Sequence, residues 1–131
     1  MSRHTLRVGY VDTDRAGVVH HARYLSYLEA ARIEMLRANG LDYGAFERET
    51  GLGLPIVEVH MAYRASARFD DVLFVETWVS SMTRAKITFD ARIVRDTELL
   101  HESSIVVACV DMAEARPVSI PDRVASACTT R

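Results

Sequence analysis

The segment from Tyr10 to Tyr24 holds the residues best suited to chemistry, because two aspartates and two histidines fall within ten positions. Asp12 and Asp14 lie in a polar turn that leads directly into a predicted helix. The first turn of a helix has unpaired backbone N–H groups and a partial positive charge, which can polarise a carbonyl oxygen. A carboxylate just upstream is placed to act as nucleophile or general base. Such an arrangement can bind an anion or support attack on a carbonyl group.

Other uses of these residues stay open on the residues alone. Aspartate and threonine before a helix are commonly caps, and glycine in a turn, such as Gly17, is commonplace. Adjacent histidines, as at His20 and His21, point in different directions, so we expect no metal site. Ser103 and Ser104 lack the context of a nucleophile elbow, which argues against a serine hydrolase.

One long helix is predicted to follow the turn, from about Val19 to Asn39. Its apolar residues recur at four-three spacing and form one stripe. The stripe consists of Tyr24, Leu28, Ala31, Met35 and Ala38. Gly40 directly after Asn39 is a typical helix stop. A shorter helix is predicted from Asp42 to Glu49, with Asp42 as its N-cap.

The rest of the chain is predicted to form strands. The first runs from Thr5 to Val11, and everything after Gly53 has strand character. The later strands are predicted at residues 55–65, 72–81, 85–95 and 99–112, with a turn at 113–117 before a short last segment. The gaps are too short for crossover helices, so consecutive strands are expected to be antiparallel neighbours. The predicted fold class is α+β, with the sheet wrapped about a single helix.

Length and composition predict one domain, residues 1–131. The formal net charge of −2 favours neither nucleic acid nor membrane insertion. Two cysteines without close spacing suggest no disulfide scaffold or zinc site, and Cys109 lies in an apolar run as a buried free thiol. The N-terminus lacks the apolar core of a signal peptide, so we expect a cytoplasmic protein.

The pattern Asp-Thr-Asp-x-x-Gly-x-Val-x-His-x-x-Tyr from Asp12 to Tyr24 resembles the 4-hydroxybenzoyl-CoA thioesterase family of hotdog proteins. It is most similar to the branch of Tol–Pal-associated acyl-CoA thioesterases. Further similarity lies in Tyr27–Arg37, Pro55–Val57 and Phe69–Leu73, and the resemblance spans roughly Leu6 to Pro121. The resemblance implies a hotdog domain, in which a curved antiparallel sheet wraps one long central helix.

The resemblance also implies roles for single residues in the turn. The family's catalytic aspartate falls on Asp14, and its carbonyl-polarising backbone N–H falls on His21. Tyr10, Gly17 and Val18 fall on substrate-binding positions. No cofactor is expected, because CoA enters as part of the substrate.

Two departures from the family pattern bear on the substrate. Position 20 is usually aromatic in the family and is His20 here. The 4-hydroxybenzoyl enzymes carry Tyr-Pro where this chain has His21 and Ala22, which argues against 4-hydroxybenzoyl-CoA itself. Asp12 is expected to stabilise the turn rather than to act as a second catalyst.

The resemblance places two further contacts with substrate outside the turn. Arg84 and Lys86 occupy positions where family members carry basic residues for the CoA phosphates, although a solvated hairpin carries such residues equally well. The strand from Pro55 to Tyr63 is expected to complete the pocket of a partner subunit. The expected assembly is therefore a homodimer, or a homotetramer of two dimers.

Three other polar positions are expected to be structural. Glu29 and Arg32, three apart on the helix, are predicted to pair with each other. His60 and His101 lie within strands and are expected to find local hydrogen-bond partners.

The predicted function is hydrolysis of a small or medium acyl-CoA thioester, with acyl carrier protein as a second candidate thiol carrier. One alternative is a hotdog hydratase or dehydratase, which also needs a histidine and an acid facing the acyl chain. Another is a non-catalytic protein that binds acyl-CoA or acyl carrier protein. Thiol release from a saturated acyl-CoA separates the thioesterase from both.

Overall fold

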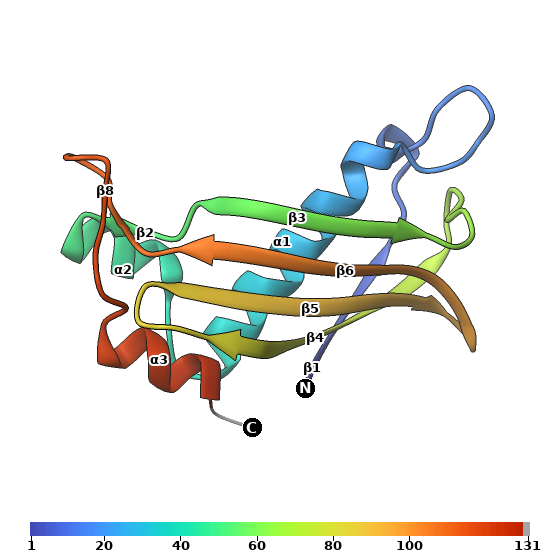
Figure 1. The fold of residues 1–131 in the computed structure, drawn as a ribbon. Coiled ribbons are helices and arrows are strands. Elements are labelled where there is room, and N and C mark those ends of the chain that lie inside the picture. The colour runs from blue at the N-terminus through green and yellow to red at the C-terminus, as the bar shows by residue number, and fades with distance from the viewer. Residues whose placement is uncertain (130–131) are drawn as a thin grey trace.

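The computed structural model describes residues 1–129, in which one sheet packs against one long helix (Figure 1). The helical elements are η1 (Tyr10–Asp12, a 3-10 turn), α1 (His21–Ala38), α2 (Tyr43–Thr50) and α3 (Asp122–Thr129). The strands are β1 (Ser2–Arg7), β2 (Leu52–Gly53), β3 (Ile56–Tyr63), β4 (Val72–Met82), β5 (Lys86–Arg95), β6 (Glu98–Ala108), β7 (Val110–Asp111) and β8 (Arg116–Pro117). The predicted α+β class is confirmed.

The main sheet has five antiparallel strands in the order β1-β4-β5-β6-β3. Helix α1 crosses one face of this sheet, the inner face, while the other face is open to solvent (Figure 1). Alternate strand residues point inward and meet the helix. Leu73 and Val75 of β4 and Ile87 and Phe89 of β5 are buried there. Each such side chain contributes about 1.5–3 kcal/mol to stability when it leaves water.

The long helix forms where its apolar stripe predicted it. Tyr24, Leu28, Ala31 and Met35 are all buried against the sheet. Ala38, the last residue of the helix, is exposed, so the prediction that it continues the stripe is wrong. No helix among residues 1–129 is long and apolar enough to cross a membrane.

The shorter helix, α2, also forms as predicted. Its N-cap is Asp42, whose side chain accepts a hydrogen bond from the backbone N–H of Ala45 at 3.1 Å. Gly51 ends the helix in the left-handed conformation, with φ 69°, which favours glycine. The helix then leads through β2 to the start of β3.

The order of the strands differs from the prediction that consecutive strands are neighbours. Strands β3 and β4 lie at different places in the sheet, since β3 pairs with β6 and β4 lies between β1 and β5. The segment between β3 and β4 causes this, because it crosses the start of α1, where Val18 and Arg68 form an isolated bridge. Strand β3 consequently forms one edge of the sheet.

Two predicted strand ends are also wrong. The first strand ends at Arg7 rather than Val11, because the Asp12 carboxylate accepts the N–H of Gly9 at 3.0 Å and folds the chain into the 3-10 turn. The strand predicted to reach Met112 ends at Ala108, where the chain leaves the main sheet and forms a second sheet of three short strands.

The C-terminal helix α3 was not predicted. Val124, Ala127 and Cys128 are buried at helical spacing, but a helix of only eight residues gives too short a pattern to be told from a strand. Cys109 is a buried free thiol, as predicted.

The predicted ion pair between Glu29 and Arg32 does not form. Arg32 is buried, with 7% of its surface exposed, and its guanidinium lies 5.7 Å from the centre of the Phe89 ring. Burial lowers the pKa of Arg32, and the nearby charge of Glu29 only partly offsets this effect. The helical spacing brings these two side chains into the same neighbourhood without a direct contact.

Candidate active site

The carboxylate of Asp14 is held by the turn that it begins. Its Oδ1 atom accepts hydrogen bonds from the backbone N–H groups of Ala16 at 2.9 Å and Val18 at 3.3 Å. Gly17, with φ 81°, supplies the left-handed residue that closes this turn. The second oxygen, Oδ2, has no hydrogen-bond partner in residues 1–129. The side chain is therefore fixed in place while one oxygen remains available for reaction.

Helix α1 begins beside this turn. His20 is the N-cap residue, but its side chain makes no capping hydrogen bond. Within residues 1–129, the backbone N–H of His21 also donates to no acceptor. Unpaired N–H groups at a helix start attract negative charge, including the charge that develops on a carbonyl oxygen under attack.

A cavity of about 380 Å³ joins these two features. Asp14 and Val18 of the turn line it together with His20 and His21. Tyr63, from the end of β3, also lines it, next to His21. An exposed carboxylate and a helix start that share one cavity have the arrangement needed for acyl transfer.

Asp12 has a different environment from Asp14, although only Thr13 separates them. Its carboxylate accepts hydrogen bonds from the Tyr27 hydroxyl at 2.8 Å and from the Gly9 N–H at 3.0 Å. Arg23 forms an ion pair with it at 2.8 Å. Burial raises the pKa of Asp12, but these hydrogen bonds and the charge of Arg23 outweigh burial and hold it below its usual range. The predicted role of Asp12 as a turn stabiliser is confirmed by these contacts.

The other predicted substrate-binding residues lie outside this cavity. The ring of Tyr10 is 79% exposed and packs edge-on against Phe69, with ring centres 5.5 Å apart. Pro55 lines a different cavity of about 620 Å³, beyond the other end of β3. Arg84 precedes β5 and donates to the Ser119 hydroxyl at 3.1 Å, while Lys86 is exposed at the start of that strand.

Two residues beside the cavity of their own chain were not predicted there, although the strand ending at Tyr63 was expected to serve a partner's pocket. Tyr63 lines the cavity, and its hydroxyl donates to the backbone carbonyl of His21 at 3.2 Å. His101 is completely buried behind Tyr63, and neither ring nitrogen has a hydrogen-bond partner in residues 1–129. The prediction that His101 finds a local partner is therefore wrong. The alternation of β3 and β6 was the available signal, since it turns both residues toward the helix.

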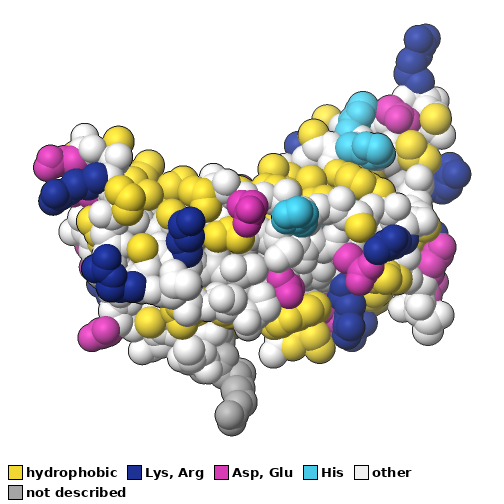
Figure 2. All heavy atoms as spheres, in the orientation of Figure 1, with side chains coloured by type: hydrophobic (Ala, Val, Ile, Leu, Met, Phe, Trp, Pro, Cys, Tyr) yellow, Lys and Arg dark blue, Asp and Glu magenta, His cyan; other side chains and the backbone are white. Residues whose placement is uncertain are grey.

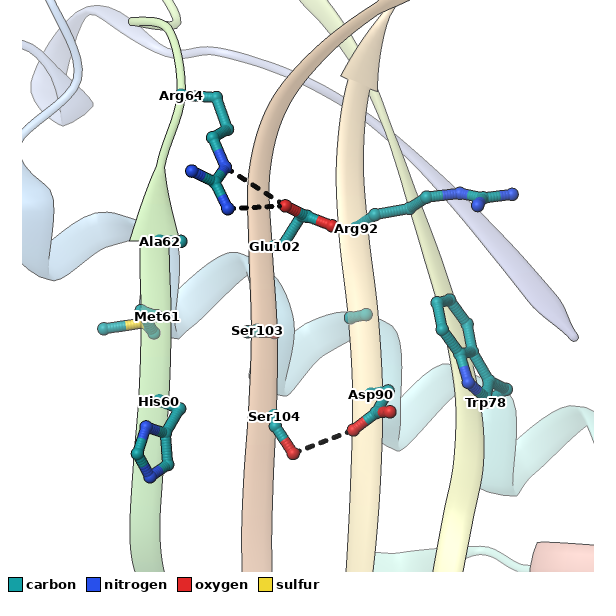
Figure 3. A pocket seen from close by; sticks show the side chains of 11 residues that line it. His60, Met61, Ala62, Arg64, Trp78, Asp90, Arg92, Glu102, Ser103 and Ser104 are labelled. Carbon is teal, nitrogen blue, oxygen red and sulfur yellow. Dashed lines mark hydrogen bonds and ion pairs between the residues drawn. The ribbon is translucent and has the colours of Figure 1, made fainter.

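The pKa of His101 is lowered to about 4, chiefly by burial; the charge of Glu102 opposes this effect and that of His21 adds to it. His101 is therefore a neutral imidazole at neutral pH. His60, in contrast, lies exposed on the outer face of the sheet (Figure 3). Within residues 1–129, no three His, Cys, Asp or Glu side chains gather in a way that could hold a metal ion.

Comparisons with known proteins all lead to thioesterases. The model of the thioesterase-like superfamily matches residues 8–128. The acyl-CoA thioesterase YbgC of Haemophilus influenzae is 40% identical over 122 residues, which cover 93% of this chain and 90% of that protein. The acyl-CoA thioester hydrolase YbgC of Escherichia coli O157:H7 is 38% identical over 120 residues, covering 91% and 89%.

Solved structures agree on the fold. A hypothetical protein from Thermus thermophilus superposes with a TM-score of 0.91 and 34% identity, and the match covers 98% of both chains. A 4-hydroxybenzoyl CoA thioesterase mutant complexed with 4-hydroxybenzoyl CoA superposes with a TM-score of 0.88 over 97% of both chains. At 23% identity, that second likeness shows the shared fold alone.

Proposed function

The chain belongs to the thioesterase-like superfamily, and on that premise we propose that it hydrolyses acyl-CoA thioesters with the carboxylate of Asp14 beside the first turn of α1. The relatives named acyl-CoA thioesterase and acyl-CoA thioester hydrolase, at 40% and 38% identity over nearly the whole chain, support this activity. The observation that carries the assignment to Asp14 is the cavity that this carboxylate shares with the start of α1.

The substrate carbonyl would bind with its oxygen toward the N–H of His21. Attack at the carbonyl carbon places negative charge on that oxygen, and the helix start stabilises this charge. The carbon–sulfur bond then breaks, and the sulfur leaves as the thiolate of CoA, which takes up a proton from water. The imidazole of His21, which is exposed in the same cavity, would orient substrate or water.

Asp14 has two routes open to it. Its free oxygen can attack the carbonyl carbon directly, forming a mixed anhydride that water then hydrolyses. It can equally accept a proton from a water molecule, which attacks in its place. Both routes use the same oxygen, Oδ2, and neither requires a metal or a cofactor. The cavity of about 380 Å³ suits a small or medium acyl group.

The phosphates of CoA would lie outside this cavity. Arg84 and Lys86 remain our proposed contacts for them, because both are basic and stand on one exposed hairpin. Tyr10 also remains a proposed contact, since its exposed ring is available to the pantetheine arm or the adenine. An acyl carrier protein could present the same thioester on a similar arm. We propose a cytoplasmic location, where acyl-CoA is available.

The working form is proposed to be a homodimer, or a tetramer of two dimers. Strand β3 is an edge strand whose outer side has no pairing partner in residues 1–129, and its Val57 and Val59 are 52% and 38% exposed. Hydrophobic side chains also gather along the rim of the molecule above β3 (Figure 2). Antiparallel pairing of β3 with its copy would bury this rim and complete the sheet hydrogen bonds.

Such pairing would also complete the site. The start of one β3, at Pro55 and Ile56, would then lie beside the end of the other, near Tyr63 and Asp14. The partner's cavity of about 620 Å³ would thereby become continuous with the reaction site. Sedimentation at two or four times the chain mass of 14.7 kDa would support this assembly, and a monomer that is fully active would refute it.

The activity is tested by thiol release from a panel of short, long and aromatic acyl-CoAs. We expect wild type to release thiol, and Asp14→Asn to reduce kcat by at least about a hundredfold, which is a common contribution of a positioned acid or base. Asp14→Asn should fold normally, because an amide oxygen can still accept the N–H groups of the turn.

Asp12→Asn is the matched control. This change weakens the contacts to Tyr27 and Arg23, so the expected loss is in stability, while kcat falls far less than in Asp14→Asn. A fully active Asp14→Asn would return Asp14 to a capping role. Absence of thiol release from every acyl-CoA by the wild type would refute the activity itself.

A further inference from the structure

Four aromatic rings connect the edge strand β3 to the start of α1. Tyr63 stacks on His21, with ring centres 4.3 Å apart and planes at 23°. It also meets the rings of Tyr24 and His101 edge to face, at 5.3 Å and 4.7 Å. His101 and Tyr24 stack on each other at 4.9 Å with planes only 5° apart. The ring of Tyr63 is therefore held from three sides, although 39% of the residue is exposed.

Tyr63 makes two separate contacts with His21. The ring stack fixes the orientation of the imidazole, which has no hydrogen bond of its own to residues 1–129. The hydrogen bond from the Tyr63 hydroxyl to the His21 carbonyl, at 3.2 Å, fixes the backbone of the same residue. One side chain thus anchors both the imidazole and the peptide group at the first position of the helix.

The start of α1 needs such an anchor. The N-cap residue His20 makes no side-chain hydrogen bond to the helix, and the first turn contains no acidic residue. A helix start without these features is less stable and its first turn frays more readily. Its N–H groups can stabilise a developing oxyanion only if they are fixed before reaction.

We propose that Tyr63 is a positioning residue for catalysis: it steadies a helix start that lacks a side-chain cap by fixing the backbone carbonyl and the imidazole of His21 relative to Asp14, and it leaves the N–H groups of the first turn free. This inference rests on the proposed thioesterase activity. Tyr24 and His101 support the role of Tyr63, because they hold its ring from behind. Tyr24 is in turn fixed by its hydroxyl, which accepts the backbone N–H of Ala67 at 3.0 Å.

Two substitutions separate the two contacts. Tyr63→Phe removes the hydroxyl and keeps the ring, so we expect kcat to fall about threefold. Tyr63→Leu also removes the stack, so we expect kcat to fall at least about tenfold, since small errors in placement are costly at a reacting centre. In both variants KM should stay within about twofold of wild type, because the loss falls on the transition state.

The matched control is His60→Leu. His60 lies three residues earlier on the same strand. It stands on the outer face of the sheet, on the side that also carries Ser104, Asp90 and Trp78, and it does not line the cavity that holds Asp14 (Figure 3). The same change to leucine there should leave kcat and KM at wild-type values. An equal loss in His60→Leu would mean that β3 is sensitive to any substitution, and would overturn the specific role of Tyr63.

A spectroscopic measurement tests the stack without reference to activity. The ring current of Tyr63 should shift the imidazole proton resonances of His21 in wild type and in Tyr63→Phe. In Tyr63→Leu these resonances should move toward the values of an exposed histidine, and the amide protons of the first helical turn should exchange faster. Unchanged His21 resonances in Tyr63→Leu would contradict the stacked arrangement.

The outcomes distinguish this inference from the proposed function. If wild type releases no thiol, the thioesterase assignment fails, and the resonances alone decide the arrangement of Tyr63 and His21. If wild type is active and a folded Tyr63→Leu keeps full kcat, Tyr63 has no positioning role. Should Tyr63→Leu fail to fold, Tyr63→Phe decides instead, and wild-type kcat in that variant overturns the inference.

Discussion

The two faces of strand β6 carry similar polar side chains in opposite environments. On the outer face, Glu102 accepts a hydrogen bond from Arg64 at 3.1 Å, and the Ser104 hydroxyl donates to Asp90 at 2.8 Å (Figure 3). These groups can also exchange their partners for water. Each of these outer-face contacts therefore contributes little to the stability of the fold.

The inner face holds the residues that alternate with these. His101 is completely buried and Ser103 is 8% exposed, and their side-chain polar atoms have no hydrogen-bond partner in residues 1–129. Thr77 on β4 is in the same position, with 2% exposed and an unpaired hydroxyl. A buried polar group without a partner costs about 1–3 kcal/mol.

The contrast teaches where polar groups in this fold reduce stability. Paired polar groups on the outer face are close to neutral in stability, whereas unpaired groups on the inner face are a net cost. The largest of these inner groups, His101, lies directly behind Tyr63 and hence behind the proposed site. Natural proteins tolerate such costs most often near functional sites.

The largest effect is expected from protonation of His101. Its pKa is about 4 in the folded protein, against an ordinary value of 6.5. Between these two values the unfolded chain binds a proton that the folded chain does not bind. The free energy of unfolding therefore keeps its full value above about pH 6.5. It falls as pH decreases toward 4, by roughly 3 kcal/mol in total.

Urea unfolding of wild type and His101→Phe across this pH range measures that loss. The variant keeps an aromatic ring against Tyr24 and Tyr63 but cannot bind a proton, so its stability should depend less on pH by the same amount. Glu102 and His21 are the groups whose electrostatic effects act on the pKa of His101, and both remain in the variant. Parallel pH curves for the two proteins would show that His101 is not the buried titrating group.

A smaller effect of opposite sign is expected at Thr77. Thr77→Val replaces an unpaired buried hydroxyl by a methyl group of similar shape, so the free energy of unfolding should rise by about 1 kcal/mol. The matched control is Thr88→Val on the outer face of β5, where the residue is half-buried and the hydroxyl can reach water. The control should change stability by less than about 0.5 kcal/mol.

Equal effects at the two threonines would weaken the comparison between the faces. A loss of stability in Thr77→Val would contradict it outright, because it would reveal a partner for the buried hydroxyl.

The same contrast explains how far the sequence could predict this structure. Periodic burial predicted α1, β4 and β5 nearly to the residue, because alternation and the helical stripe depend only on which side of an element meets the core. The N-cap at Asp42 was predictable for a similar reason, since its hydrogen bond is local. The turn containing Asp14 and the start of α1 at His21 were likewise local features.

Non-local features were not predictable in this way. The position of β3 at the sheet edge depends on the crossing of residues 64–71 over α1, which no pattern within that segment encodes. For the same reason Tyr63 and His101 were missed: they lie 38 positions apart in the sequence, and only the pairing of β3 with β6 makes them opposite neighbours. The candidate carboxylate was thus visible in the sequence, while the ring cluster behind it required the fold.

The smallest effect is expected at Glu102, on the outer face directly beside His101. Glu102→Gln removes the ion pair with Arg64. The Glu102 side chain is 48% exposed and that of Arg64 is 56% exposed, so the free energy of unfolding near neutral pH should change by less than about 0.5 kcal/mol. What little is lost should disappear when the salt concentration is raised, because salt screens exposed charges.

Glu102 nevertheless connects the two faces through its charge. This carboxylate favours the protonated form of His101 and therefore raises its pKa, opposing burial. In Glu102→Gln the pKa of His101 should fall further. The fall in the free energy of unfolding on acidification should then continue to lower pH, while its value at neutral pH stays nearly the same. NMR titration of the His101 imidazole would measure this shift, with Glu114→Gln on an exposed distant turn as control. A loss of more than about 1 kcal/mol at neutral pH would instead mean that outer-face pairs are structural, and the distinction between the two faces of β6 would fail.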